Sequence, residues 1–355
     1  MSRFRRRGLG EDFGYVPGEQ PADGAQWLKL NTNESPLPPS PRVAPAVAAA
    51  AAGLRAYPDP FAEPLRSALA RRHRAKPEQV FVANGADQVL DCCYRAFVDP
   101  GSTVVRTWPT YSLLPVLTRM FSAVDVEVPF EAGASLPSRF ATTPAALRFV
   151  VNPNSPTGRW ITPSVLSEQL GAASGVVVID EAYCDFAPES CIPLLPRHEN
   201  WLVARTLSKS HALAGLRVGY AVGSTALIAD LYSVKDSYPV DRCAIAGAIA
   251  ALDDEQHHRD IVGTVLAERA RLADLLTDRG WKVLPSAANF IFAKPPDGAS
   301  AATVAARLRE NRILVRHFET PALAAGLRIT VGAPGDTDRL VAALDQQVGA
   351  VSGGA

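Results

Sequence analysis

The sequence predicts an α/β protein, with a large domain built on a mostly parallel sheet covered by helices and a smaller α+β domain. Between about residues 83 and 222, short apolar runs alternate with longer helical patterns, which is typical of a parallel sheet with helices on its faces. The run 176–179 is apolar at every position, as expected of a strand buried on both faces. After residue 262 the rhythm changes, which indicates a second fold unit.

The large domain is expected to begin after the Pro-rich link 35–41. The alanine-rich run 43–52 is too short to span a bilayer and contains Pro45, so we expect a helix at the surface or at an interface. Six runs rich in β-branched or apolar residues follow as candidate strands: 80–82, 103–106, 147–151, 176–180, 201–206 and 216–222.

The small domain is expected to combine two separate parts of the chain. Residues 36–262 would form the large domain, and residues 1–35 would join residues 263–355 in the small one. Its expected elements are an amphipathic helix at 263–279, strands at 281–284 and 289–293, a helix at 301–311, strands at 313–316 and 327–331, and a last helix after Asp336.

Composition narrows the possible partners. The 355 residues are 47% hydrophobic and 20% charged, which is enough apolar material for a large core. Lys and Arg number 36, as do Asp and Glu, so no net field attracts nucleic acid or an anionic membrane, and a small-molecule partner is expected. The basic opening is followed by Gly8–Asp12 instead of an apolar stretch, which argues against an export signal and favours the cytoplasm.

Cysteine and histidine positions argue against disulfides and metal sites. The cysteines are five, an odd number without a Cys-x-x-Cys pair, which fits a reducing compartment. His257 and His258 are adjacent, and neighbouring positions on a helix do not face one ligand. We therefore expect a solvated helix end there and no metal.

An acidic and a basic residue stand at the carboxyl ends of two successive predicted strands. Asp180 ends the strand 176–180, at the edge where open α/β sheets bind ligands. A buried carboxylate there requires a cation, such as the protonated ring nitrogen of a cofactor, unless it merely caps a helix. Lys209 follows the next strand and should reach the same edge. Ser208 and Arg217 flank it and can hold one phosphate between a hydroxyl and a guanidinium group.

The turn Asn84–Asp87, between a predicted strand and helix, is a weaker phosphate candidate. Small residues there let backbone N–H groups and the helix dipole approach an anion, but a glycine in such a turn is more often only a turn residue.

Several motifs together resemble fold-type-I aminotransferases, and most closely the histidinol-phosphate aminotransferase family. The resemblance covers nearly the whole chain and is carried by the runs 14–18, 30–36, 57–59, 152–158, 180–183, 206–220 and 327–332. It implies pyridoxal 5′-phosphate as cofactor, a small-molecule amino donor and an oxo acceptor, and a homodimer with shared active sites.

The resemblance also implies roles for individual residues. Lys209 would be the Schiff-base lysine and the proton-transferring base, Asp180 would pair with the ring nitrogen, and Tyr183 would hydrogen-bond the ring hydroxyl. Tyr111 would stack on the ring. The cofactor phosphate would be held by Gly85, Ala86, Asp87, Ser208, Arg217 and, from a second subunit, Tyr57. The substrate's anionic end would be bound by Arg328, Arg316 and Tyr15.

Three positions depart from the family pattern. Ser155 stands where asparagine usually contacts the ring hydroxyl, so Tyr183 or a shifted Asn154 would have to cover that task. Gln88 replaces a common glutamate. His211 replaces a large aromatic residue, and a structural ring is the simpler interpretation.

The two arginines favour a phosphate-bearing amine such as histidinol phosphate, with glutamate and 2-oxoglutarate as the partner pair. Four alternatives stay open: an aromatic amino-acid aminotransferase or one of a secondary-metabolite pathway, an amino-acid phosphate decarboxylase, a non-catalytic sensor that binds the cofactor, and an unrelated α/β protein.

Overall fold

The computed structural model describes residues 2–6, 9, 13–21, 26–130 and 135–352. The stretch Gly8–Asp12, on which the export-signal expectation depends, lies outside these ranges except for Leu9. Within them, no helix is long and apolar enough to cross a membrane.

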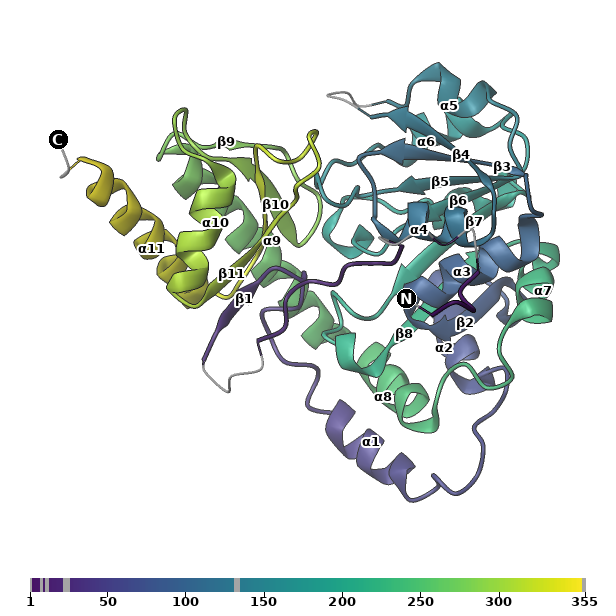
Figure 1. The fold of residues 1–355 in the computed structure, drawn as a ribbon. Helices are drawn as coiled ribbons and strands as arrows, with labels where there is room; N and C mark the ends of the chain where they lie inside the picture. The colour runs from purple at the N-terminus through teal and green to yellow at the C-terminus, as the bar shows by residue number, and fades with distance from the viewer. Residues whose placement is uncertain (1, 7–8, 10–12, 22–25, 131–134, 353–355) are drawn as a thin grey trace.

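A seven-stranded sheet forms the larger part of the molecule (Figure 1). Its strands, in spatial order, are β2 (Val80–Asn84), β8 (Val218–Gly223), β7 (Trp201–Thr206), β6 (Val176–Asp180), β5 (Leu147–Val151), β3 (Thr103–Trp108) and β4 (Val124–Pro129). Strand β8 runs antiparallel to both of its neighbours, and the remaining pairs are parallel. The predicted fold class, with its mostly parallel sheet, is confirmed.

Helices cover both faces of this sheet because alternate strand residues point to opposite sides. In β2, Val80 and Val82 belong to one buried cluster and Phe81 and Ala83 to the other. The first cluster is covered by α1 (Val43–Ala51), α2 (Glu63–His73), α5 (Ser138–Thr142), α6 (Pro163–Leu170) and α8 (Arg242–Leu252). The second is covered by α3 (Gly85–Phe97), α4 (Leu113–Met120) and α7 (Thr225–Val234).

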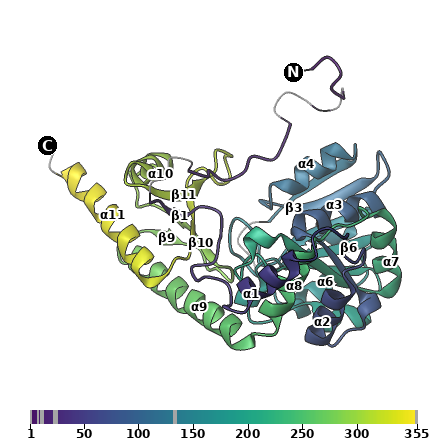
Figure 2. The ribbon, with the colours of Figure 1, turned by 90° about the horizontal axis from the view of Figure 1, so that it is seen from below.

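A second, five-stranded sheet combines both ends of the chain. Its order is β1 (Leu28–Leu30), β11 (Ile313–His317), β12 (Leu327–Thr330), β10 (Phe290–Lys294) and β9 (Lys282–Val283). Strand β1 pairs in parallel with β11, and the other pairs are antiparallel. Its core is completed by α9 (Glu255–Thr277), α10 (Ala301–Glu310) and α11 (Pro334–Ser352), with α9 and α11 side by side (Figure 2).

All six strands predicted for the large sheet are present, but two further strands were missed. Strand β4 alternates valine with Asp125 and Glu127, as suits an edge strand with one solvent-exposed face. It therefore lacks the continuous apolar run of its neighbours. Strand β1 has only three residues and depends on its pairing with β11, far along the chain. The fold also contains short 3₁₀ helices, at Pro77–Gln79, Cys184–Phe186, Ile192–Arg197 and Ala214–Leu216.

Helix α9 begins eight residues before its predicted start at residue 263, because Asp254 caps it by accepting from the His257 N–H. It therefore runs across the predicted boundary at residue 262, and the division into domains stays a prediction.

Candidate active site

A cavity of about 790 Å³ lies where the carboxyl edge of the seven-stranded sheet meets the second sheet. The strands β5, β6 and β7 end at this edge, so the residues that follow them converge there. Because β8 runs in the opposite direction, it begins at the same edge and delivers Arg217. Arg316 and Arg328 enter the cavity from the second sheet.

Lys209 lines the cavity directly after β7 and is half-buried. Its Nζ donates a hydrogen bond to the Thr32 carbonyl at 3.2 Å. Burial, reinforced by the positive charge of Arg328, lowers its pKa from 10.5 to about 8. A substantial fraction of the amine is therefore neutral near pH 8, as a nucleophile or base requires.

Asp180 lies at the end of β6 with only 4% of its surface exposed. Its Oδ1 accepts the Ala182 N–H at 3.0 Å, and no cation of the described chain lies within ion-pair distance. Burial raises its pKa to about 7. A protonated pyridine nitrogen is the kind of partner that such a carboxylate lacks, and this fits pyridoxal phosphate.

One end of the cavity, where the resemblance implies the cofactor phosphate, is built around the first turn of α3. Ala86, Asp87, Ser208 and Arg217 all line the cavity. The thirteen-residue helix α3 directs the positive end of its dipole toward this place, which suits an anion. Arg217 is held by Asp87, with Nη2 3.4 Å from Oδ2.

Two glycines allow this turn to pack closely. Gly85, the first residue of α3, has a φ of +80°, and a Cβ there would lie 2.6 Å from Arg217 Nη2. A Cβ on Gly219, in β8, would lie 2.2 Å from the carbonyl carbon of Gly85. Only glycine at both positions lets β8 and the start of α3 approach this closely.

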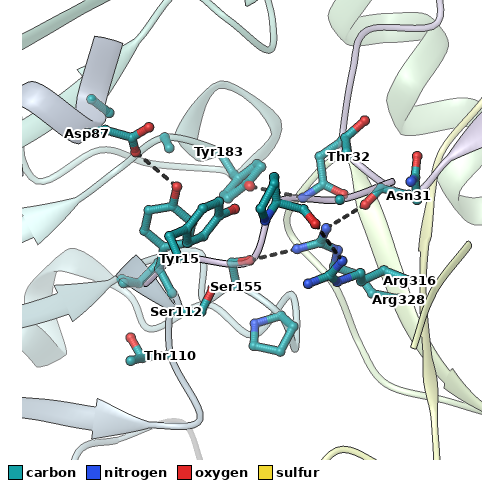
Figure 3. Close-up of a pocket in the computed structure, with 18 of the residues that line it drawn as sticks. Tyr15, Asn31, Thr32, Asp87, Thr110, Ser112, Ser155, Tyr183, Arg316 and Arg328 are labelled. Carbon is teal, nitrogen blue, oxygen red and sulfur yellow. Dashed lines mark hydrogen bonds between the residues drawn. The ribbon is translucent and has the colours of Figure 1, made fainter. Parts of the chain in front are cut away.

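Aromatic and hydroxyl groups form the wall beside Lys209. The Tyr111 hydroxyl donates to Asp87 Oδ1 at 2.9 Å, and the Tyr15 ring meets the Tyr111 ring edge-on with centroids 6.0 Å apart. Figure 3 shows Tyr15, Tyr183 and Ser155 gathered at the centre of the cavity. Burial raises the pKa of Tyr183, while the hydroxyl of Ser155 acts in the opposite direction.

Arg316 and Arg328 lie opposite each other on β11 and β12, and both line the cavity (Figure 3). Arg328 donates to Ser155 Oγ at 3.3 Å and to the Asn31 carbonyl at 2.8 Å, and its buried Nε has no partner. Arg316 donates to backbone carbonyls of the 16–17 segment. Neither guanidinium group has a carboxylate partner among the described residues, so two positive charges face the cavity.

Some predicted site residues lie outside the cavity lining. Asn154 is fully buried beside the cavity, where its amide donates to the Pro109 carbonyl and accepts from Thr157. Its role at the ring hydroxyl stays a prediction. Tyr57 is 78% exposed and stacks on Tyr238 with ring centroids 4.4 Å apart. Gly85 is also absent from the cavity lining. Gln88, which departs from the family pattern and was not a predicted site residue, accepts the Asn84 N–H in the same turn.

His211 is a buried structural ring that stacks on His258, with centroids 4.3 Å apart. The expectation of a solvated helix end is therefore wrong for His258, which has a side chain only 14% exposed. Donor atoms of Asp185, His211 and His258 lie within 4.8 Å of one another. The Asp185 carboxylate is already bound by Arg205 and by Ser210, so this cluster is a charged network behind the Lys209 loop.

The chain belongs to the class I and II aminotransferase family, whose model matches residues 25–345. It is 46% identical to histidinol-phosphate aminotransferase 2 of Thiobacillus denitrificans, over 97% of both chains. It is also 44% identical to histidinol-phosphate aminotransferase 2 of Dechloromonas aromatica, over 98% of this chain and 100% of that one.

Solved structures of aminotransferases superpose on this chain. The histidinol-phosphate aminotransferase of Sinorhizobium meliloti, in complex with pyridoxal-5′-phosphate, superposes with a TM-score of 0.85 at 27% identity over 91% of each chain. The N-succinyldiaminopimelate aminotransferase of Mycobacterium tuberculosis gives a TM-score of 0.79 at 28% identity, over 90% of this chain and 92% of that one.

The segment Asn31–Glu34 lines the cavity, although the sequence motifs imply no role for its individual residues. The sequence marks this segment only through the family resemblance of the run 30–36. Its contacts reach Lys209, Tyr183 and Arg328, which the chain brings near only after folding.

Proposed function

We propose that this protein transfers an amino group from a phosphorylated amine of the histidinol phosphate type to 2-oxoglutarate, giving glutamate. The observation that carries the proposal is the pair Arg316 and Arg328, which face the cavity without a carboxylate partner among the described residues. Two guanidinium groups match a phosphate dianion better than a single carboxylate. The names of the curated relatives agree with this substrate.

The cofactor is pyridoxal 5′-phosphate. Its phosphate would be held at the start of α3 by Ala86, Asp87, Ser208 and Arg217, and its ring nitrogen by Asp180. When bound, it supplies an electron sink for the bonds at the substrate's α-carbon.

The residues around it orient the reactants and move one proton. Asp180, as a carboxylate, holds a proton on the ring nitrogen. Tyr183 donates a hydrogen bond to the ring hydroxyl oxygen. Lys209 would hold the cofactor and, as a neutral amine with its pKa lowered by burial, would accept the proton from the substrate's α-carbon. Tyr111 stacks on the ring and excludes water from one face.

A panel of amino donors tests the substrate. Holoenzyme would be mixed with histidinol phosphate, phenylalanine or ornithine, and the change in cofactor absorbance followed, with 2-oxoglutarate restoring the starting spectrum. We expect histidinol phosphate to react with the highest kcat/KM. A preference for phenylalanine would contradict the phosphorylated substrate, and release of carbon dioxide without amino transfer would contradict the transaminase reaction itself.

The arginine pair allows a sharper test. We expect Arg316→Ala to raise KM for histidinol phosphate by roughly tenfold or more while changing KM for glutamate less, because glutamate brings a carboxylate that Arg328 can bind alone. We expect Arg328→Ala to impair both substrates. The two KM values, measured separately in each half-reaction, check this, and equal effects of Arg316→Ala on both substrates would contradict the division.

We also infer a cytoplasmic homodimer, in which Tyr57 of one subunit reaches the cofactor phosphate of the other. The exposed position of Tyr57 outside its own cavity supports this arrangement.

A further inference from the structure

Asn33 is a fully buried residue that joins the two sheets at the cavity. It is 1% exposed and has a φ of +56°, a conformation that asparagine tolerates better than most residues. Its backbone carbonyl accepts from the Asn289 side chain at 3.0 Å, which fixes the segment against β10. The amide group of Asn33 points the other way, between Thr330 and Tyr183.

The hydrogen bonds of Thr330 indicate the orientation of the Asn33 amide, that is, which neighbour its oxygen and its nitrogen face. The Thr330 hydroxyl accepts the Asn33 backbone N–H at 3.0 Å and donates its own proton to Asn33 Oδ1 at 3.1 Å. Since Oδ1 faces Thr330, the amide nitrogen must face Tyr183, and Nδ2 lies 2.9 Å from the Tyr183 hydroxyl. A hydroxyl has one proton and two acceptor positions. Tyr183 therefore accepts from Asn33.

We propose that Asn33 is a positioning residue that commits the Tyr183 hydroxyl to donate its proton into the cavity, toward the ring oxygen of the cofactor. An acceptor position of Tyr183 is occupied by Asn33, so the phenol proton cannot turn toward the second sheet. Accepting a hydrogen bond also polarises the O–H bond and makes the phenol a stronger donor.

The geometry around Tyr183 supports this role. Its ring is held edge-on against Phe290 of β10, with centroids 5.0 Å apart, so the hydroxyl has little freedom to move. The Ser155 hydroxyl accepts from Arg328, which leaves its proton for Tyr183, and both Asn33 and Ser155 oppose the effect of burial on the pKa of Tyr183. The inference rests on the proposed role of Tyr183 and is independent of the substrate.

The test is the pH midpoint of the visible absorbance change of the holoenzyme. A hydrogen bond donated to the ring oxygen favours its anionic form and so lowers this midpoint; losing that bond raises it. We expect Tyr183→Phe to raise the midpoint, and Asn33→Ala to raise it by roughly half a pH unit because the bond is weakened and not removed. The double variant should have the same midpoint as Tyr183→Phe alone, because Asn33 acts through Tyr183.

Two further variants separate positioning from simple structural support. Thr330→Val keeps the side-chain volume but removes the hydroxyl that orients the Asn33 amide, so we expect a shift in the same direction; it serves as the main test if Asn33→Ala fails to fold. Asn289→Ala removes a hydrogen bond to Asn33 without touching its amide, and should lower the melting temperature with an unchanged midpoint.

The outcomes distinguish the role of Tyr183 from that of Asn33. An unchanged pH midpoint in Tyr183→Phe would contradict the proposed role of the tyrosine. If the pH midpoint shifts in Tyr183→Phe but not in Asn33→Ala or Thr330→Val, the inference on Asn33 is overturned and the role of Tyr183 stands. An Asn33→Ala shift of the same size in both backgrounds would also overturn it, because the effect would then not pass through Tyr183.

Discussion

At the residue scale, the cavity holds an acid and a base whose pKa values are both displaced toward neutrality. Burial raises the pKa of Asp180 to about 7 and lowers the pKa of Lys209 to about 8, because each group has lost water without gaining a full countercharge. Such displaced values cluster at functional sites, and here they belong to residues that meet at one sheet edge. Both groups therefore change their protonation state between about pH 7 and 8 in the cofactor-free protein.

Replacing Asp180 with asparagine should separate stability from activity. We expect Asp180→Asn to stabilise the cofactor-free protein above pH 7, where the wild-type carboxylate is charged and buried. The rise of the Asp180 pKa from the usual 3.8 to about 7 sets an upper limit of roughly 4 kcal/mol on this gain in the free energy of unfolding. Since this folded-state pKa is raised, the advantage of asparagine should shrink as the pH falls from 7 to 4. Activity should fall by roughly 10²-fold or more. Urea unfolding at several pH values checks the first effect.

Lys209 should react as an unusually acidic amine in the cofactor-free protein. Competitive acetylation followed by mass spectrometry measures the neutral fraction of each lysine at a given pH. We expect the labelling of Lys209 to rise with pH to a midpoint near its pKa of about 8. Free lysine serves as the reference. A midpoint at the ordinary 10.5 would show that the site does not desolvate the amine.

At the scale of elements, the reversed direction of β8 builds the proposed phosphate end of the cavity. A parallel β8 would have begun at the far edge of the sheet and carried Arg217 away from Lys209. Arg217 itself has a φ of +53°, directly before the strand starts. Gly219 then lets the strand pack directly against the first turn of α3.

A methyl group at Gly219 should disturb this contact. We expect Gly219→Ala to destabilise the protein by about 2–3 kcal/mol, because its Cβ would meet backbone atoms that cannot move aside cheaply. Cofactor affinity should fall as the turn at Gly85 is displaced. Thermal unfolding and cofactor titration measure both effects. The exposed Gly263, in the middle of α9 with open space around it, is the control, and Gly263→Ala should be neutral or slightly stabilising.

At the scale of the whole molecule, the active site needs parts from distant regions of the chain. The segment after β1 contacts Lys209, Tyr183 and Arg328 at once, while β11 and β12 supply the paired arginines. Exposed Tyr57 and Tyr238 stack on the outer surface, away from the cavity of their own subunit. In the proposed homodimer, this pair would complete the neighbouring site.

Subunit mixing tests the shared site. Lys209→Ala and Tyr57→Ala variants should each be nearly inactive at low cofactor concentration. After mixing and subunit exchange, one of the two sites in each mixed dimer contains both native residues. We expect recovery to roughly a quarter of wild-type activity, because half the dimers are mixed and half their sites are complete. Absence of recovery in a mixture shown to exchange subunits would contradict the shared site.

The sequence alone determined the α/β class, six strands of the large sheet and the residues that follow them, because buried strands need continuous apolar runs and ligands bind where such strands end. It missed the wet edge strand β4 and the short β1, whose stability comes from partners distant in sequence.

Tertiary structure decided what local patterns could not determine. It directed the Asn154 amide into the protein interior, buried His258 against His211, and brought Asn33 to the Tyr183 hydroxyl. Each of these contacts joins segments far apart in the chain, so it depends on packing between elements. Local motifs therefore contain the residue types that supply the chemistry. Some of the hydrogen bonds that orient these residues, such as those from Asn33 to Tyr183 and from Arg328 to Ser155, arise only when the two sheets meet.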